Sequence, residues 1–195
     1  MRIGIDIDDT LAQTTNYLMP FALKYDKEVL NKNGIVNPEL DLPRCFDWTK
    51  EELSYFLRNI FEKEILNIPV MENAKQEIIK LRNAGNDIII ISSRNKFQLS
   101  KPYLLTKKWL EINDIVVDKL IVEAKYKGPI IEEEGIDLLI DDSVGQCEFV
   151  ADNNKIPVIL FPKETNNVEH NGVIRLNGWD EINDCVATLA KHKVV

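Results

Sequence analysis

Residues 3–10 read IGIDIDDT, an apolar run of the kind that forms a buried strand, and it runs into three aspartates. In an extended chain alternate side chains point the same way, so Asp6 and Asp8 lie on one side and Asp9 on the other. Carboxylates placed this close together repel one another, and they either take up protons or hold a cation. We therefore predict that Asp6 and Asp8 share a site.

Further short runs rich in Ile, Leu and Val predict the other strands of a sheet. They cover residues 87–92, 118–122, 137–141 and 157–161, and residues 173–176 are a sixth candidate. Near-continuous apolar character is typical of parallel strands covered by helices on both faces. Helical patterns separate the runs, and Ser100 is the expected N-cap of one of these helices. The alternation predicts a three-layer α/β domain built on a doubly wound parallel sheet.

One long segment interrupts this alternation. Between residues 13 and 73 the chain has two helical stretches, joined by a loop that contains two prolines and an aromatic cluster. A connection from a strand to a helix usually takes about 2 to 6 residues, so this segment is too long to be one. We predict an α/β core of residues 1–12 and 74–195, and a small helical cap of residues 13–73 inserted after the first strand.

The composition disfavours several classes of protein. The chain has 195 residues and a net charge of −8, which disfavours a nucleic acid polymer as partner. No apolar run reaches the roughly 18 residues of a membrane span. The three cysteines are widely spaced, as expected for reduced thiols. We expect a cytoplasmic protein with no membrane partner, and the sequence leaves open whether it forms a homodimer.

Polar side chains follow three of the predicted strands, where the carboxyl ends of parallel strands form the usual ligand-binding edge. In chain order they are Asp6, Asp8, Ser92, Ser93, Asp141 and Asp142. Acidic oxygens without a nearby His or Cys indicate a hard cation, and Mg²⁺ is the commonest when phosphate is also present. Hydroxyls donate to phosphate oxygens, and Lys125 or Lys127 adds a positive charge. Each residue alone is ordinary, but together in this order they predict a site.

This order resembles the four motifs of the haloacid dehalogenase (HAD) superfamily, from Ile3 to Ser143. The resemblance implies a Rossmann-like core with a C1 cap, and Mg²⁺-dependent hydrolysis of a phosphomonoester through an aspartyl-phosphate. By position it implies that Asp6 is the nucleophile and Asp8 the general acid and base. It implies that Ser92 stabilises the transferred phosphoryl group.

The resemblance also implies a metal site and a motif lysine. Asp142, with Asp141 beside it, matches the metal-binding acids, and Asp6 and the backbone carbonyl of Asp8 complete the implied Mg²⁺ ligands. We choose Lys127 over Lys125 as the motif lysine, because it directly precedes a helix-like segment.

The substrate depends on the cap. The cap and the stretch DLLIDDS (residues 137–143) resemble the 5′(3′)-deoxyribonucleotidases and their bacterial relatives, which implies a (deoxy)nucleoside monophosphate. Phe46 and Trp48, which lie in a loop, are predicted to line the pocket and stack on a base. Ser93 and Arg94 are predicted to contact the phosphate.

Two other functions stay open. The same chemistry can act on a sugar phosphate or another small phosphomonoester. Alternatively, receiver-like signalling domains gather acids, a hydroxyl and a lysine around Mg²⁺ and act as phosphorylation switches. The DxDxT order and the long insertion disfavour a receiver-like domain.

Overall fold

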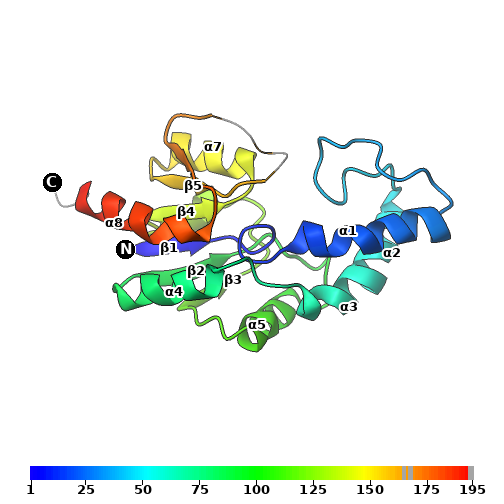
Figure 1. The fold of residues 1–195 in the computed structure, drawn as a ribbon, viewed down its shortest axis with the longest axis horizontal. Coiled ribbons are helices and arrows are strands. Elements are labelled where there is room, and N and C mark those ends of the chain that lie inside the picture. The colour runs from blue at the N-terminus through cyan, green and yellow to red at the C-terminus, as the bar shows by residue number, and fades with distance from the viewer. Residues whose placement is uncertain (164–165, 167–168, 193–195) are drawn as a thin grey trace.

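The fold is built on a six-stranded parallel sheet with the strand order β3-β2-β1-β4-β5-β6. The computed structural model describes residues 1–163, 166 and 169–192. The strands are β1 (Arg2–Ile5), β2 (Asp87–Ile91), β3 (Lys119–Ile121), β4 (Leu138–Asp141), β5 (Val158–Leu160) and β6 (Val173–Arg175). The predicted α/β fold with a parallel sheet is therefore confirmed, including its sixth strand (Figure 1).

The two faces of the sheet bury different sets of residues. Ile3 lies opposite Ile88 in β2 and opposite Leu138 in β4, so the side chains of the central strands alternate in phase. One face packs against α4 (Ala74–Asn83), α5 (Pro102–Ile112) and α8 (Ile182–His192), and the other against α6 (Gly128–Glu134) and α7 (Val144–Asn153). Helices on both faces explain why the strands are apolar throughout.

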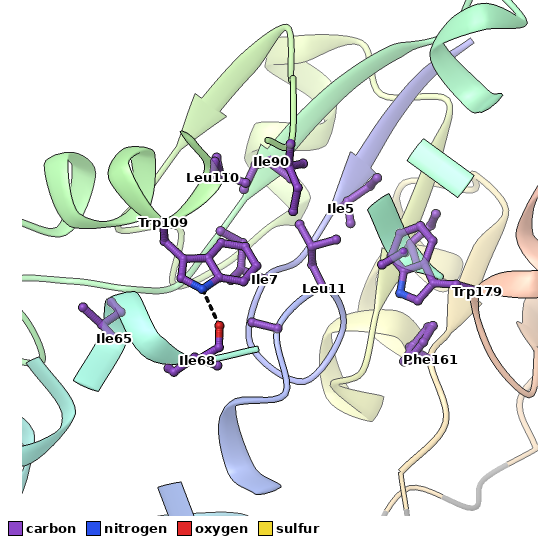
Figure 2. Close-up of a cluster of buried hydrophobic side chains, with 14 of the residues drawn as sticks. Ile5, Ile7, Leu11, Ile65, Ile68, Ile90, Trp109, Leu110, Phe161 and Trp179 are labelled. Carbon is purple, nitrogen blue, oxygen red and sulfur yellow. Dashed lines mark hydrogen bonds between the residues drawn. The ribbon is translucent and has the colours of Figure 1, made fainter. Parts of the chain in front are cut away.

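Two buried tryptophans attach the connecting loops to the first of these faces (Figure 2). The indole N–H of Trp109 on α5 donates to the carbonyl of Ile68 at 2.8 Å. The indole N–H of Trp179, which lies just before α8, donates to the carbonyl of Thr10, also at 2.8 Å. Each indole therefore fills the core and satisfies a loop carbonyl at the same time.

One predicted helix end is wrong. The residue that precedes α5 as its N-cap is Lys101, and Pro102 occupies the first turn. The backbone N–H of Ser100 instead donates to the Glu62 carboxylate at 2.7 Å, and its hydroxyl donates to the same carboxylate. The Glu62 carboxylate is charged, so it is a stronger acceptor for Ser100 than the end of α5 offers.

Between β1 and α4 the chain forms a group of helices and no strand of the sheet, and we call residues 13–70 the helical segment. They are α1 (Thr14–Lys24), η1 (Tyr25–Val29), α2 (Lys50–Phe56), η2 (Leu57–Phe61), α3 (Glu62–Glu64) and η3 (Ile65–Asn67). Figure 1 shows α1, α2 and α3 beyond the end of the sheet toward which β1 runs. No helix in the described ranges is both long enough and apolar enough to cross a bilayer.

The helical segment starts and ends at neighbouring points. Ala12 and Val70 form an antiparallel bridge, and the N–H of Gln13 donates to the carbonyl of Pro69 at 2.9 Å. The N–H of Met71 donates to the carbonyl of Leu11 at 2.8 Å. These backbone hydrogen bonds join the two ends of the helical segment, so the chain leaves the core and returns to it at the same place.

Gly4 should be intolerant of a side chain, because β1 lies in the middle of the sheet. A Cβ there would lie 2.9 Å from the Cδ1 atom of Ile91, which is fully buried. We expect Gly4→Ala to lower the free energy of unfolding by about 1–3 kcal/mol in urea denaturation. Gly145→Ala is the control, because no atom lies within 4 Å of its added Cβ. It should stabilise α7 by roughly 0.5–1 kcal/mol, and an equal loss in both variants would contradict the packing argument.

Candidate functional site

Three buried or partly buried carboxylates meet where the strand order reverses, between β1 and β4. Asp6 directly follows β1, Asp141 ends β4, and Asp142 follows it. The backbone N–H of Asp6 donates to the carbonyl of Ile140 at 2.9 Å and continues the ladder between these two strands. Oxygen atoms of the three carboxylates lie within 4.8 Å of one another. This edge is where open α/β sheets bind ligands.

A buried lysine lies between two of these acids. Lys127 directly precedes α6, and its Nζ donates to Asp6 Oδ1 and to Asp141 Oδ2, each at 2.5 Å. Burial lowers the pKa of Lys127, but the two carboxylates outweigh this effect and raise it, so the group is charged. Lys125, the alternative, lies over the ring of Tyr126 instead. Of the two lysines, the geometry brings only Lys127 to the acids.

The acidic cluster brings three carboxylates together, and Lys127 contacts two of them. Burial raises the pKa of Asp6 well above its ordinary value, although Lys127 opposes the shift. Burial and the charge of Asp141 raise the pKa of Asp142 to about 7. In the described part of the chain, Oδ2 of Asp6 accepts no hydrogen bond. An all-oxygen donor set fits a hard divalent cation such as Mg²⁺.

Asp8 is oriented by a bidentate ion pair. The Arg94 guanidinium donates from Nε to Oδ2 of Asp8 at 2.9 Å and from Nη2 to Oδ1 at 2.7 Å. The hydroxyl of Thr14, the first residue of α1, donates to Oδ1 at 2.6 Å. Burial raises the pKa of Asp8, but Arg94 and Thr14 outweigh it, so the pKa lies below its usual range. Asp8 is therefore ionised and held in one orientation.

The three residues predicted to contact or stabilise phosphate follow β2, and their side chains differ in exposure and in hydrogen-bond partner. Ser92 is fully buried, and its hydroxyl accepts the backbone N–H of Arg94 at 3.3 Å. Ser93 is exposed at the same edge. The Arg94 side chain is fully buried and its guanidinium binds Asp8. A contact between any of these residues and phosphate stays a prediction.

Sequence reasoning missed Lys163, which follows β5 at the same edge of the sheet. Its Nζ lies 2.7 Å from Asp142 Oδ2, 3.3 Å from Asp9 Oδ2 and 3.2 Å from Asp41 Oδ1. Asp41 belongs to the loop of the helical segment, so Lys163 joins that segment to the core. Its place directly after a predicted strand was the available signal, but no motif marks it.

A cavity of about 690 Å³ opens beside this ion-pair cluster, between the core and the helical segment. Asp9, Asp41 and Lys163 form one part of its wall. The rest is mostly apolar, and it comes from α1, from the loop before α2, and from Met71 and Pro162. Asn16 and Thr15 are further polar groups in the wall. This size is typical of a small-molecule site.

Phe46 and Trp48, the predicted stacking residues, are not among the residues that line this cavity. Their rings stack on each other with centroids 4.5 Å apart. Trp48 also packs against Tyr25 and Phe56, and its indole N–H donates to Asp26 at 2.7 Å. In the structure both rings contribute to the core of the helical segment, and stacking on a base stays a prediction.

No family model matches the sequence. The chain is 26% identical over 186 residues to the Bacillus subtilis protein named "Putative nucleotidase YqfW". The alignment covers 93% of this chain and 91% of that protein.

Solved structures identify the fold. A predicted phosphoglycolate phosphatase from Haemophilus somnus superposes with a TM-score of 0.66 at 14% identity, over 95% of this chain and 97% of that one. An HAD family hydrolase from Deinococcus radiodurans, solved with bound phosphate and sodium, superposes with a TM-score of 0.65 at 12% identity, over 97% and 96% of the two chains. The predicted HAD-like fold is therefore confirmed.

Mg²⁺ should stabilise the folded protein through the acidic cluster. At a concentration near 100 times its dissociation constant it should add ~2.7 kcal/mol to the free energy of unfolding and raise Tm in a thermal melt. Asp142→Asn should lose most of this increase, yet be no less stable without Mg²⁺, because it removes a like charge.

The control for this melt is Asp152→Asn, which changes an exposed acid near the other end of α7. It should respond to Mg²⁺ as the unaltered chain does. An unchanged Mg²⁺ response in Asp142→Asn would place the cation elsewhere.

Proposed function

We propose that this chain, with its HAD-like fold, is a Mg²⁺-dependent phosphomonoester hydrolase that acts through an aspartyl-phosphate. The observation that carries the proposal is the arrangement at the end of β1. There Asp6 lies against a buried, charged Lys127, and Asp8 is fixed two residues further on. A nucleophile beside a cation, with a second acid in reach of the same edge, is suited to phosphoryl transfer.

Asp6, Asp142 and the backbone carbonyl of Asp8 would hold Mg²⁺, with Asp141 beside them. When bound, the cation would offset the charge of the phosphate oxygens, so that an anionic carboxylate could approach phosphorus. Burial and mutual repulsion raise the pKa values of Asp6 and Asp142, and a cation bound to both would relieve that repulsion, which supports this assignment.

In the first step a carboxylate oxygen of Asp6 attacks phosphorus, and the bond between phosphorus and the ester oxygen breaks. Asp8 gives a proton to the departing alcohol oxygen. The phosphate dianion is a like charge beside Asp8, so its arrival raises the pKa of Asp8 and favours the protonated form. Lys127 and Ser92 stabilise the charge on the transferred group.

In the second step water attacks the aspartyl-phosphate. Asp8, now a carboxylate, takes a proton from this water. The new bond to phosphorus releases Asp6 and inorganic phosphate. Arg94 favours the ionised form of Asp8, which is the form that can accept this proton.

For the substrate we propose a (deoxy)nucleoside monophosphate. The cavity places two carboxylates, Asp9 and Asp41, beside Lys163, which is already paired with both and with Asp142. This charge repels a second anionic group, so it favours a neutral leaving group. The apolar walls favour a base over a sugar alone, and the likeness to the B. subtilis protein supports the same choice.

Asp6→Asn tests the chemistry. Removal of the nucleophile should lower the release of inorganic phosphate with Mg²⁺ by at least about a thousandfold, since an amide does not form the covalent intermediate. The phosphate adduct should be found on Asp6 by mass spectrometry of acid-quenched protein. Lys125→Met is the control and should keep full turnover, because Lys125 lies away from the acids. Sustained turnover by Asp6→Asn would refute the mechanism.

A panel of phosphomonoesters tests the substrate. Nucleoside 5′-monophosphates should give kcat/KM values at least about tenfold above those of hexose phosphates, since contact between the planar faces of a base and the apolar walls should add ~1–3 kcal/mol. Phosphoglycolate, with its second anionic group, should be among the poorest. A hexose phosphate at the top of the ranking would favour the sugar-phosphate alternative. Stoichiometric labelling without turnover would favour a phosphorylation switch.

A further inference from the structure

The Arg94 guanidinium forms an ion pair with Asp8. Its side chain is fully buried, and both of its contacts with Asp8 are shorter than 3.0 Å. Its remaining nitrogen, Nη1, points to the hydroxyl of Thr106 at 3.5 Å, and the guanidinium lies 6.0 Å from the centre of the Trp109 ring. Among the described residues, Asp8 is the carboxylate that pairs with it.

The backbone of Arg94 is fixed as well. Its N–H donates to Ser92 Oγ at 3.3 Å, and its carbonyl accepts the N–H of Glu123 at 2.9 Å. The loop after β2 is therefore joined to the loop after β3, which fixes the position from which the guanidinium reaches Asp8. The burial of this side chain and its pairing with Asp8 argue against the phosphate contact that the sequence predicts for it.

A planar guanidinium that grips both oxygens fixes the plane of a carboxylate, which one ammonium group does not do. Thr14 adds a third hydrogen bond to Asp8 from the side of the helical segment. The Asp8 side chain keeps 28% of its surface exposed, so it is fixed but still accessible. Holding a proton-transfer group in one orientation is what an effective general acid and base needs.

We propose that Arg94 is a positioning residue that orients Asp8 for proton transfer and does not contact the substrate. The inference rests on the proposed function, in which Asp8 protonates the leaving alcohol. It separates the role of Arg94 from a phosphate contact and from a purely structural ion pair.

The dependence on the leaving group tests this role. An alkyl phosphate needs its leaving oxygen protonated, whereas p-nitrophenyl phosphate has a stable leaving anion. For Arg94→Lys we expect kcat/KM to fall by about a hundredfold on an alkyl phosphate, which is the typical size of general acid catalysis. On p-nitrophenyl phosphate it should fall by less than about threefold. The ratio kcat/KM reports only the steps up to and including the first irreversible one. The later attack by water on the aspartyl-phosphate therefore does not affect it.

Further variants and an inhibition measurement test the same role of Arg94. Asp8→Asn should show the same selectivity, and Arg94→Lys combined with it should add little, because the two residues act as one unit. Inhibition by inorganic phosphate should be unchanged in Arg94→Lys. Arg94→Gln, which buries no charge, should repeat the selectivity and guards against a failure specific to lysine, with Tm measured for every variant.

The outcomes separate the explanations. An equal fall on both substrates, with weaker inhibition by phosphate, would make Arg94 a phosphate contact and overturn the inference. Unfolding of both Arg94 variants would make the pair purely structural and overturn it as well. If the unaltered chain hydrolyses no phosphomonoester, the proposed function itself fails. If it does so but Arg94→Lys shows no selectivity, only the positioning role fails.

Discussion

The ammonium group of Lys127 is the contact on which the rest of the site depends. It binds Asp6 at the end of β1 and Asp141 at the end of β4, and all three side chains are buried. Two buried carboxylates without a partner would cost several kcal/mol each. The lysine therefore makes it possible for two adjacent parallel strands to end in acid inside the protein. The position of α6, which begins just after Lys127, follows from the same contact.

The strands were predictable because their signal is local. Helices on both faces force β1, β2 and β4 to be apolar throughout, and the printed sequence shows this directly. The positions of Asp6, Asp141 and Lys127 were predictable for the same reason, since they directly follow, end and precede a regular element, respectively. Asp8 lies two residues beyond Asp6. The prediction that Ser100 is an N-cap was wrong because its acceptor, Glu62, is distant in the chain, and no local rule detects such a partner.

The partners of the charged residues were beyond the reach of sequence reasoning for the same physical cause. Arg94 and Asp8 are separated by 86 residues, and Lys163 and Asp41 meet only because the helical segment lies over the end of the sheet. The aromatic pair Phe46 and Trp48 illustrates a related point. A loop position indicates that a ring is free to line a pocket, but it does not reveal which other rings compete for it.

The hydrogen bonds that close the core beneath the helical segment have a consequence for the evolution of the protein. Leu11 and Met71 are joined directly by a backbone hydrogen bond, so the sheet does not depend for its continuity on the segment between Gln13 and Val70, which are 57 positions apart. A segment anchored in this way can lengthen, shorten or be exchanged at little cost in loop entropy. The helical segment can therefore vary in length without disturbing the strands that carry the acidic cluster at the end of the sheet.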